Sequence, residues 1–395
     1  MKSITVTACI LLVVTGLFSQ TGEDRNITIG ERGTIYSKVL NEHRNFSVYL
    51  PPSHMDTTLT EEYPVIYVLD GDWYFHVTSG IIQYAKGAFK LPEMIVVAIS
   101  NVDRIRDFTP TNTDKDMFGK VTAGLESSGG ASNFTSFLQQ ELIPHIDSSY
   151  RTMNFRILAG HSFGGLLANH IFITNNDLFQ SYIIIDPSLW WDGAKQVGQT
   201  KEFLANHPFL SSTVFFGEAD YELNIENANT PHIEAMNTYK EFFNMFPLDS
   251  IRYKSVVFEN ETHASVGLPS IYHGLSFLFE GYRPTDPTFL SSKLLASHYE
   301  ALSQKYKVNM YPPEGLVRNL GWGAHYGEKN LEKALEFFKL NTTNYPESSN
   351  AFKVLAEAYE ADDQLTKAIS AYKKSLELNP QNTSINEKIN QLQKE

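Results

Sequence analysis

The clearest chemical signal in this sequence is a serine between two glycines, within residues 155–168 (FRILAGHSFGGLLA). β-forming residues run into Gly160-His161-Ser162-Phe163-Gly164, and small residues that suit the start of a helix follow. A strand, a sharp turn and a helix together are the setting in which G-x-S-x-G becomes a nucleophile elbow. The turn strains the serine backbone, and the flanking glycines are needed because a Cβ there would clash. Ser162 is the candidate nucleophile, and the amide N–H of Phe163 is a candidate oxyanion donor at the helix start.

A serine hydroxyl needs a neutral imidazole to take its proton, and the imidazole needs a carboxylate to fix its tautomer. In an open α/β sheet such groups belong in loops that follow strands, because the ligand crevice lies outside the carboxyl ends of the strands. His263 follows the last expected strand and is the candidate base. Asp220 and Glu218, at the end of the strand before it, compete for the role of acid. Asp220 is favoured because its distance from Gly217 gives the chain room to turn toward His263.

Other residues are expected to line the same crevice. The second oxyanion donor should be the backbone N–H of Asp72, in the loop that follows the strand over 65–69, although this loop also fits an ordinary strand-end turn. Three indoles, those of Trp73, Trp190 and Trp191, could form a wall for an aromatic or acyl group or could simply pack a loop. The sequence has no H-E-x-x-H motif, paired His/Cys cluster or phosphate-type glycine loop, so nothing in it supports a metal or a cofactor.

Composition limits the classes of partner. The chain has 395 residues, of which 42% are hydrophobic and 13% aromatic, so it can form one large globular domain and a smaller one. Its formal net charge of −13 argues against binding to nucleic acid or another polyanion. Cys9 is the only cysteine, so stability must come from packing and not from disulfides.

The N-terminus is typical of an export signal over residues 1–20. Lys2 gives a short positive region, residues 4–18 are apolar, and small or polar residues follow. The apolar run is too short for a comfortable membrane span, although an uncleaved anchor is an alternative. The sequence therefore predicts an exported protein, periplasmic or extracellular, with no transmembrane span after the signal is removed.

The pattern of apolar residues predicts an open α/β sheet over residues 26–283. Two leading segments alternate like an edge hairpin, five short apolar runs then suit strands buried on both faces, and a last strand is expected over 251–258. Helical patterns separate most of these runs, which gives eight mostly parallel strands with helices on both faces. The expected strands are 26–40, 45–50, 65–69, 94–99, 157–159, 182–185, 214–216 and 251–258, and the expected helices are 78–84, 132–146, 166–174, 230–246 and 271–280.

The last part of the chain, residues 284–395, is predicted to be a small all-α domain. The segments 331–346 (LEKALEFFKLNTTNYP) and 365–380 (LTKAISAYKKSLELNP) align along their length with a period of 34 residues. That period, with A-x3-F/Y and a closing proline, is the tetratricopeptide signature. Two repeats cannot bury a solenoid core alone, so they should pack against the preceding domain or against residues 291–326. Such repeats suggest a protein partner.

Taken together, several stretches resemble the esterase D-like branch of the α/β hydrolases, which includes feruloyl esterases, siderophore trilactone esterases and the antigen 85 mycolyltransferases. The resemblance implies an α/β-hydrolase fold with Ser162 as nucleophile, His263 as base, and the amides of Asp72 and Phe163 as the oxyanion hole. The family often has serine at the position of Asp186, a difference expected to alter the crevice and not the core chemistry. The matching stretches are 63–75, 101–111, 137–152, 159–168, 186–191 and 261–275.

These observations favour an exported serine esterase that works through an acyl-enzyme, with a siderophore, feruloyl or acetyl ester as the substrate class. Two alternatives stay open. One is an acyltransferase that uses the same triad, and the other is a non-catalytic tetratricopeptide scaffold with an inert hydrolase domain. A serine labelled by a fluorophosphonate would separate the enzymes from the scaffold.

Overall fold

The computed structural model describes residues 27–393 apart from 58, 88–89, 222–229 and 247–250. The expected export signal, residues 1–20, lies outside this part. None of the helices within the described ranges is long and apolar enough to cross a membrane.

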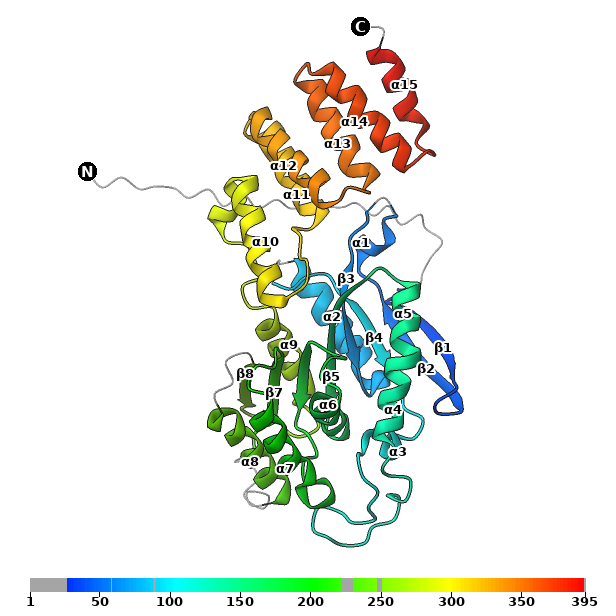
Figure 1. Cartoon of the computed structure of the whole chain (residues 1–395), viewed down its shortest axis with the longest axis vertical. Coiled ribbons are helices and arrows are strands. Elements are labelled where there is room, and N and C mark those ends of the chain that lie inside the picture. The colour runs from blue at the N-terminus through cyan, green and yellow to red at the C-terminus, as the bar shows by residue number, and fades with distance from the viewer. Residues whose placement is uncertain (1–26, 58, 88–89, 222–229, 247–250, 394–395) are drawn as a thin grey trace, which may run out of the picture.

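Eight strands form one sheet, which confirms the predicted fold class (Figure 1). The order across the sheet is β1-β2-β4-β3-β5-β6-β7-β8. β1 pairs with β2 and β2 with β4 in antiparallel fashion, and every other pairing is parallel. The strands are β1 (Glu31–Ser37), β2 (Glu42–Tyr49), β3 (Tyr63–Val68), β4 (Ile95–Ile99), β5 (Thr152–His161), β6 (Ser181–Ile185), β7 (Thr213–Ala219) and β8 (Arg252–Phe258).

Helices cover both faces of the sheet, which is why the central strands are mostly apolar on both faces. Side chains alternate between the faces: Val65 and Tyr67 of β3 pack on one core cluster, and Ile66 and Val68 on the other. The helices of the first face are α3 (Arg104–Phe108), α4 (Ala131–Phe137), η1 (Leu138–Leu142), α5 (Ile143–Ser149), α6 (Phe163–Thr174), α7 (Trp191–Asn206) and α8 (Pro231–Met245). Those of the second face are α2 (Gly71–Gly87) and α9 (Gly267–Leu278). The short helix α1 (Pro52–Met55) precedes β3.

Two of the longer helices that cover the sheet differ from the sequence expectation. The helix expected over 78–84 begins earlier, at Gly71, directly after β3. Helix α7 was not expected at all, because its sequence is polar on average and its first turn contains left-handed residues at Asp192, Gly193 and Ala194. Both helices start at the carboxyl ends of strands and therefore border the crevice.

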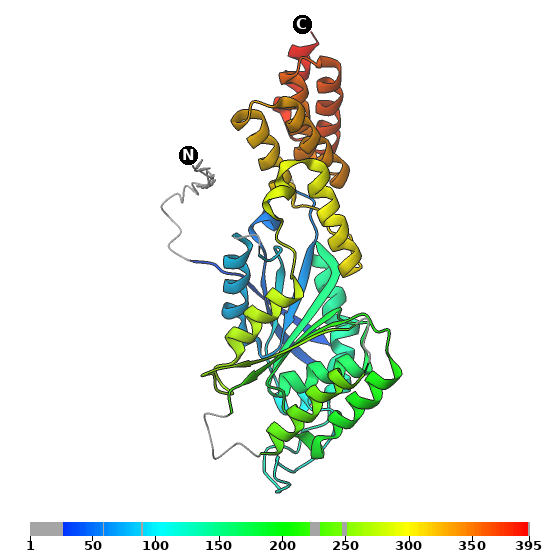
Figure 2. The same ribbon diagram turned by 90° about the vertical axis from the view of Figure 1, so that its left-hand side faces the viewer.

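The C-terminal part of the chain is all-α and lies beyond the end of the sheet at which β3 and β5 begin (Figures 1 and 2). The repeated segments form α12 and α14, and Ala334 and Ala368 are fully buried at equivalent positions in them. The tetratricopeptide assignment itself stays a prediction. The helices are α10 (Ser292–Tyr306), α11 (Glu314–Trp322), η4 (Gly323–Gly327), α12 (Leu331–Asn344), α13 (Ser349–Ala361), α14 (Leu365–Leu378) and α15 (Thr383–Leu392), after the short η3 (Asp286–Leu290).

Two kinds of contact join these helices to the sheet. Tyr306 of α10 packs edge-on against Phe155 of β5, within the core cluster on the α2 and α9 face. Glu61, just before β3, accepts a hydrogen bond from the backbone N–H of Glu314 at the start of α11. A carboxylate at this position accepts from an amide that has no partner within the helix, and its negative charge interacts favourably with the helix dipole. Burial raises the pKa of Glu61 to about 7.

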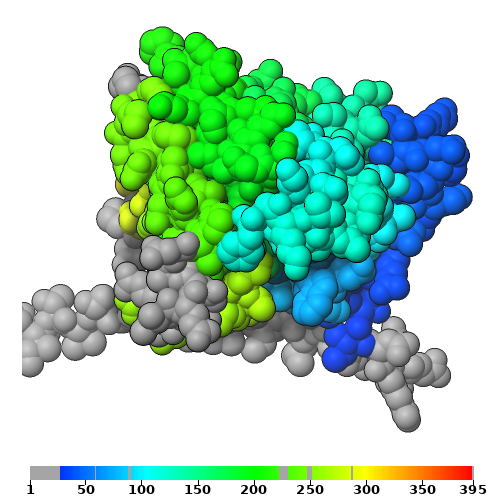
Figure 3. All heavy atoms as spheres, turned by 90° about the horizontal axis from the view of Figure 1, so that it is seen from below, coloured from blue at the N-terminus to red at the C-terminus, as the bar shows by residue number. Residues whose placement is uncertain are grey.

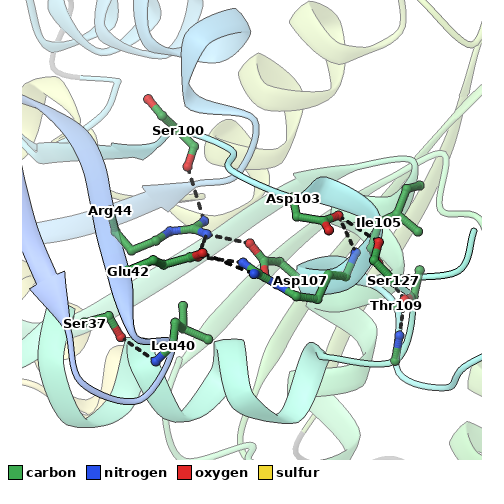
Figure 4. Close-up of polar contacts among 12 residues, drawn as sticks. Ser37, Leu40, Glu42, Arg44, Ser100, Asp103, Ile105, Asp107, Thr109 and Ser127 are labelled. Carbon is green, nitrogen blue, oxygen red and sulfur yellow. Dashed lines mark hydrogen bonds and ion pairs between the residues drawn. The ribbon is translucent and has the colours of Figure 1, made fainter. Parts of the chain in front are cut away.

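A buried ion pair fixes the edge hairpin to the loop that follows β4 (Figure 4). Arg44 of β2 lies 2.6 Å from Asp107 of α3, and both side chains are 1% exposed. Arg106 bonds the other oxygen of Asp107 at 2.8 Å and also bonds Glu42 at 2.6 Å. The network positions α3, and with it Arg104 next to the crevice.

Removing one partner of this pair should destabilise the fold more than removing both. Arg44→Met leaves the buried carboxylate of Asp107 without the Arg44 guanidinium. We therefore expect the free energy of unfolding, measured by urea denaturation, to fall by about 3–5 kcal/mol. Arg44→Met combined with Asp107→Leu should recover part of that loss. Equal or greater destabilisation in the double variant would show that the pair contributes net stability beyond charge compensation.

Candidate active site

Ser162 stands at the sharp turn between β5 and α6. Its backbone has φ 59° and ψ −116°, a conformation that a non-glycine residue adopts only when its surroundings impose it. Two backbone hydrogen bonds hold the turn: the N–H of Ser162 donates to Ile185 O at 2.9 Å, and the N–H of Ser188 donates to Ser162 O at 3.0 Å. The turn therefore presents the hydroxyl at the carboxyl end of the sheet.

His263 connects Ser162 to a buried aspartate. Its Nε2 lies 3.1 Å from the Ser162 hydroxyl oxygen, and its Nδ1 lies 2.7 Å from an Oδ2 of Asp186. His263 comes from the loop between β8 and α9 and is partly exposed, whereas Asp186 directly follows β6 and is fully buried. The three side chains form the hydrogen-bond chain of a nucleophile, a base and an orienting acid.

The carboxylate that contacts His263 is that of Asp186, and not that of Asp220 or Glu218, the two acids that the sequence favoured. Glu218 is turned to Lys240 of α8, at 2.5 Å. Asp220 accepts a hydrogen bond from the backbone N–H of Asn260 at 3.4 Å. The physical reason lies in the register: β5 and β6 are neighbours, and His161 pairs with Ile185, so residues 162 and 186 leave the sheet side by side.

Sequence reasoning placed Asp186 in the crevice without giving it this role. The signal that could have found it is an aspartate immediately after a five-residue apolar strand, at the same strand-end position as the serine. Asp186 also has φ 42°, and its N–H donates to Gly217 O at 2.7 Å, which turns its side chain across the strand ends.

The surroundings of Asp186 keep it ionised. Burial opposes the charge, but the nearby imidazole of His232 and the hydrogen bond from His263 outweigh that effect and hold the pKa of Asp186 well below its usual range. A buried carboxylate that stays charged can hold the imidazole of His263 in the tautomer with Nδ1–H, which leaves Nε2 free to accept the proton of Ser162.

His161 packs against the ring of His263 and is not part of the hydrogen-bond chain from Ser162 to Asp186. Its ring centroid is 4.6 Å from that of His263, and burial, followed by the neighbouring His263, lowers its pKa to about 4. His161 is therefore neutral near pH 7 and adds no charge beside the base. His161, Asp186 and His263 offer ligand atoms within 4.8 Å of one another, a spacing that a metal ion could use. Using it would require His263 and Asp186 to give up their mutual hydrogen bond.

The two expected oxyanion donors stand at the starts of helices. Phe163 is the first residue of α6, and Asp72 is the second residue of α2, so neither backbone N–H has an acceptor within its own helix. Asp72 is held by its side chain, which accepts a hydrogen bond from Ser100 at 3.0 Å. The loop before it approaches β4 closely: a Cβ on Gly71 would lie 2.6 Å from the backbone carbon of Ala98.

Arg104 links this loop to the elbow. Its guanidinium bonds both oxygens of Asp70, at 2.6 and 2.9 Å, and donates to the backbone oxygen of His161 at 3.1 Å. Asp70 has φ 55°, so the turn after β3 is constrained as the turn at Ser162 is. The contacts of Arg104 therefore connect the turn before Asp72 to the elbow before Phe163, the two candidate oxyanion donors.

The three tryptophans do not form one wall. Trp191 is 1% exposed, and its indole N–H donates to Thr111 O at 3.1 Å, so it packs a loop and cannot line an open crevice. Trp190 is partly buried, with its ring 5.9 Å from that of Phe163. Trp73, on α2, is 84% exposed. Figure 3 views the end of the sheet at which the strands finish, where the loop after β4 (cyan) lies beside the green region that includes α7.

A side chain at Gly160 should break the elbow. A Cβ there would lie 2.2 Å from the backbone oxygen of Gly164, which cannot move without shifting α6. We expect Gly160→Ala to lose more than 90% of any serine labelling by a fluorophosphonate and to lower the melting temperature by about 4 °C or more.

The matched control is Gly198→Ala, because Gly198 lies within α7 and a Cβ there meets nothing within 4 Å. That variant should keep its labelling and gain about 0.5–1 kcal/mol of stability. Normal labelling of Gly160→Ala would show that the turn tolerates a Cβ and that the elbow geometry is not required.

An eight-stranded α/β sheet with a strained serine after its central strand defines an α/β hydrolase, and comparison with known proteins agrees. Residues 37–218 match the family described as "Putative esterase". The ferri-bacillibactin esterase BesA of Bacillus subtilis is 26% identical over 243 residues, which are 57% of this chain and 82% of that protein. The crystal structure of an IroE-like serine hydrolase from Shewanella oneidensis has a TM-score of 0.72 and 26% identity, and the match covers 80% of this chain and 99% of that one.

A third comparison reaches into the helical part. An uncharacterised protein from Capnocytophaga ochracea matches 93% of this chain and 100% of its own, with a TM-score of 0.59 and 19% identity, so the two share their fold. Residues 37–218 of the sheet domain therefore resemble the esterase family, and the protein is a carboxylic ester hydrolase.

Proposed function

We propose that this protein is an exported serine esterase in which Ser162, His263 and Asp186 carry out acyl-enzyme chemistry. The observation that carries the proposal is the continuous hydrogen-bond chain from the Ser162 hydroxyl through both ring nitrogens of His263 to the carboxylate of Asp186. Each group has the role that its chemistry requires: a weak nucleophile, a base next to it and a buried anion that orients the base.

In the first half of the reaction, His263 Nε2 accepts the Ser162 proton while the oxygen attacks the ester carbonyl carbon. The charge that develops on the carbonyl oxygen is stabilised by the amides of Phe163 and Asp72. The imidazolium of His263, held by Asp186, then gives its proton to the leaving alcohol. In the second half, His263 activates a water molecule, which releases the acid and restores Ser162.

For the substrate class, we propose a siderophore ester as the first compound to test. The support is the likeness to BesA, which is named for its action on ferri-bacillibactin. Of the two indoles beside Phe163, that of Trp191 is buried and that of Trp190 is partly exposed, so Trp190 and Phe163 offer an aromatic contact near the nucleophile. Hydrolysis and acyl transfer share the triad, and product analysis with added alcohol acceptors separates them.

Replacing the nucleophile is the direct test. We expect Ser162→Ala to lower kcat for p-nitrophenyl acetate by about 10⁴-fold or more, because the acyl-enzyme can no longer form. Labelling of the wild-type protein by a fluorophosphonate should disappear in the same variant. Unchanged turnover by the alanine variant would exclude Ser162 as the nucleophile.

The assignment of the acid is tested by two matched amide substitutions. Asp186→Asn keeps the shape of the side chain but removes the charge that holds the His263 tautomer, so kcat should fall by about 10³–10⁴-fold. Asp220→Asn, in the loop after the next strand, should stay within about threefold of wild type. The reverse ranking of these variants would return the acid role to Asp220.

A further inference from the structure

A tyrosine and a second histidine lie against the buried side of Asp186, and the triad chemistry does not account for them. The hydroxyl of Tyr221, two residues after β7, is 2.7 Å from Oδ2 of Asp186. Nε2 of His232, on α8, is 2.8 Å from the Tyr221 oxygen and 3.6 Å from Oδ1 of Asp186. These contacts join two further elements to the acid.

The direction of each proton in this cluster follows from Asp186. An ionised carboxylate can only accept hydrogen bonds, so the single hydroxyl proton of Tyr221 points at Asp186. The Tyr221 oxygen must then be the acceptor toward His232, and Nε2 of His232 must carry a proton. Nδ1 of His232 is consistent with this tautomer: it is buried and has no hydrogen-bond partner within the described ranges, as suits a bare nitrogen.

The cluster also explains how the carboxylate keeps its orientation. Oδ2 of Asp186 accepts from both Tyr221 and His263, whereas Oδ1 has no hydrogen bond at ordinary distance among the described residues and faces only Nε2 of His232. Without Tyr221, one oxygen would be held by His263 alone and the carboxyl plane could rotate. A buried carboxylate with too few donors also loses the stabilisation that keeps it charged.

Building on the function proposed above, we propose that Tyr221 and His232 are positioning residues of this esterase. His232 directs the Tyr221 proton onto Asp186, and Tyr221 holds the carboxylate where Nδ1 of His263 meets it. The loop after β7 thus supplies the donor that supports the acid.

The first test is Tyr221→Phe, measured on p-nitrophenyl acetate. The ring stays and the hydroxyl goes, so we expect kcat to fall about 10-fold, which is the size of one hydrogen bond to a charged group, with KM within about twofold. In an Asp186→Asn background the same substitution should lower kcat almost no further, because the carboxylate through which Tyr221 acts is already absent. Independent losses that multiply in the double variant would overturn the proposal.

His232 is tested by a pair of substitutions. His232→Gln keeps an N–H donor close to the position of Nε2 and should retain most of kcat, whereas His232→Leu removes the donor and should lower kcat about as much as Tyr221→Phe does. Equal activity of the two variants would show that His232 serves only to fill space.

Tyr239→Phe is the control for loss of a buried tyrosine hydroxyl. Tyr239 lies on α8, as His232 does, and its hydroxyl has no hydrogen-bond partner within the described ranges. That variant should keep wild-type kcat. The outcomes also separate the two proposals. A wild-type protein without ester turnover or fluorophosphonate labelling would contradict the proposed function. An active wild-type protein with an equally active Tyr221→Phe variant would contradict only the positioning role of Tyr221.

Discussion

The backbone of Ser162 is the constraint on which the rest of the site depends. A non-glycine residue at φ 59° and ψ −116° is unfavourable by about 1–3 kcal/mol, and the surrounding structure must impose it. It is imposed by β6, whose Ile185 accepts the Ser162 amide, and by Gly160, which allows α6 to start directly over the end of β5. The position of the nucleophile is thus fixed by packing between two strands and a helix, and not by its own side chain.

The same arrangement explains the place of the acid. Because β5 and β6 are adjacent and in register, the residue that follows β6 leaves the sheet beside Ser162. His263, in the loop after β8, contacts both Ser162 and Asp186. In the sheet order, β7 lies between β6 and β8. The segment after β7 contributes Tyr221, which contacts Asp186. The segments that follow four adjacent strands, β5 to β8, therefore supply the members of one hydrogen-bonded chain.

Local sequence patterns were sufficient for much of this and insufficient for one essential point. Apolar runs buried on both faces predicted five of the eight strands, an alternating pattern predicted the edge hairpin, and the glycines around Ser162 predicted the turn. These signals all depend on neighbours in the chain. The partner of His263 depends on which strands are adjacent and how they are registered, so the sequence favoured Asp220 over Glu218 and gave Asp186 no role as the acid. Trp191 was similarly ambiguous, since its burial under the loop after β4 is set by tertiary packing.

The helical tail meets the sheet at the opposite end from the chemistry. Its contacts involve Glu61, just before β3, and Phe155, early in β5, whereas Ser162 lies just past the finish of β5. The length of a parallel strand therefore separates the two tasks of the chain, with anchorage at the amino termini and catalysis at the carboxyl termini. Sequence change on the outer surfaces of α12–α15 can accumulate without displacing the nucleophile, which leaves that end of the molecule free to diverge while the crevice keeps its geometry.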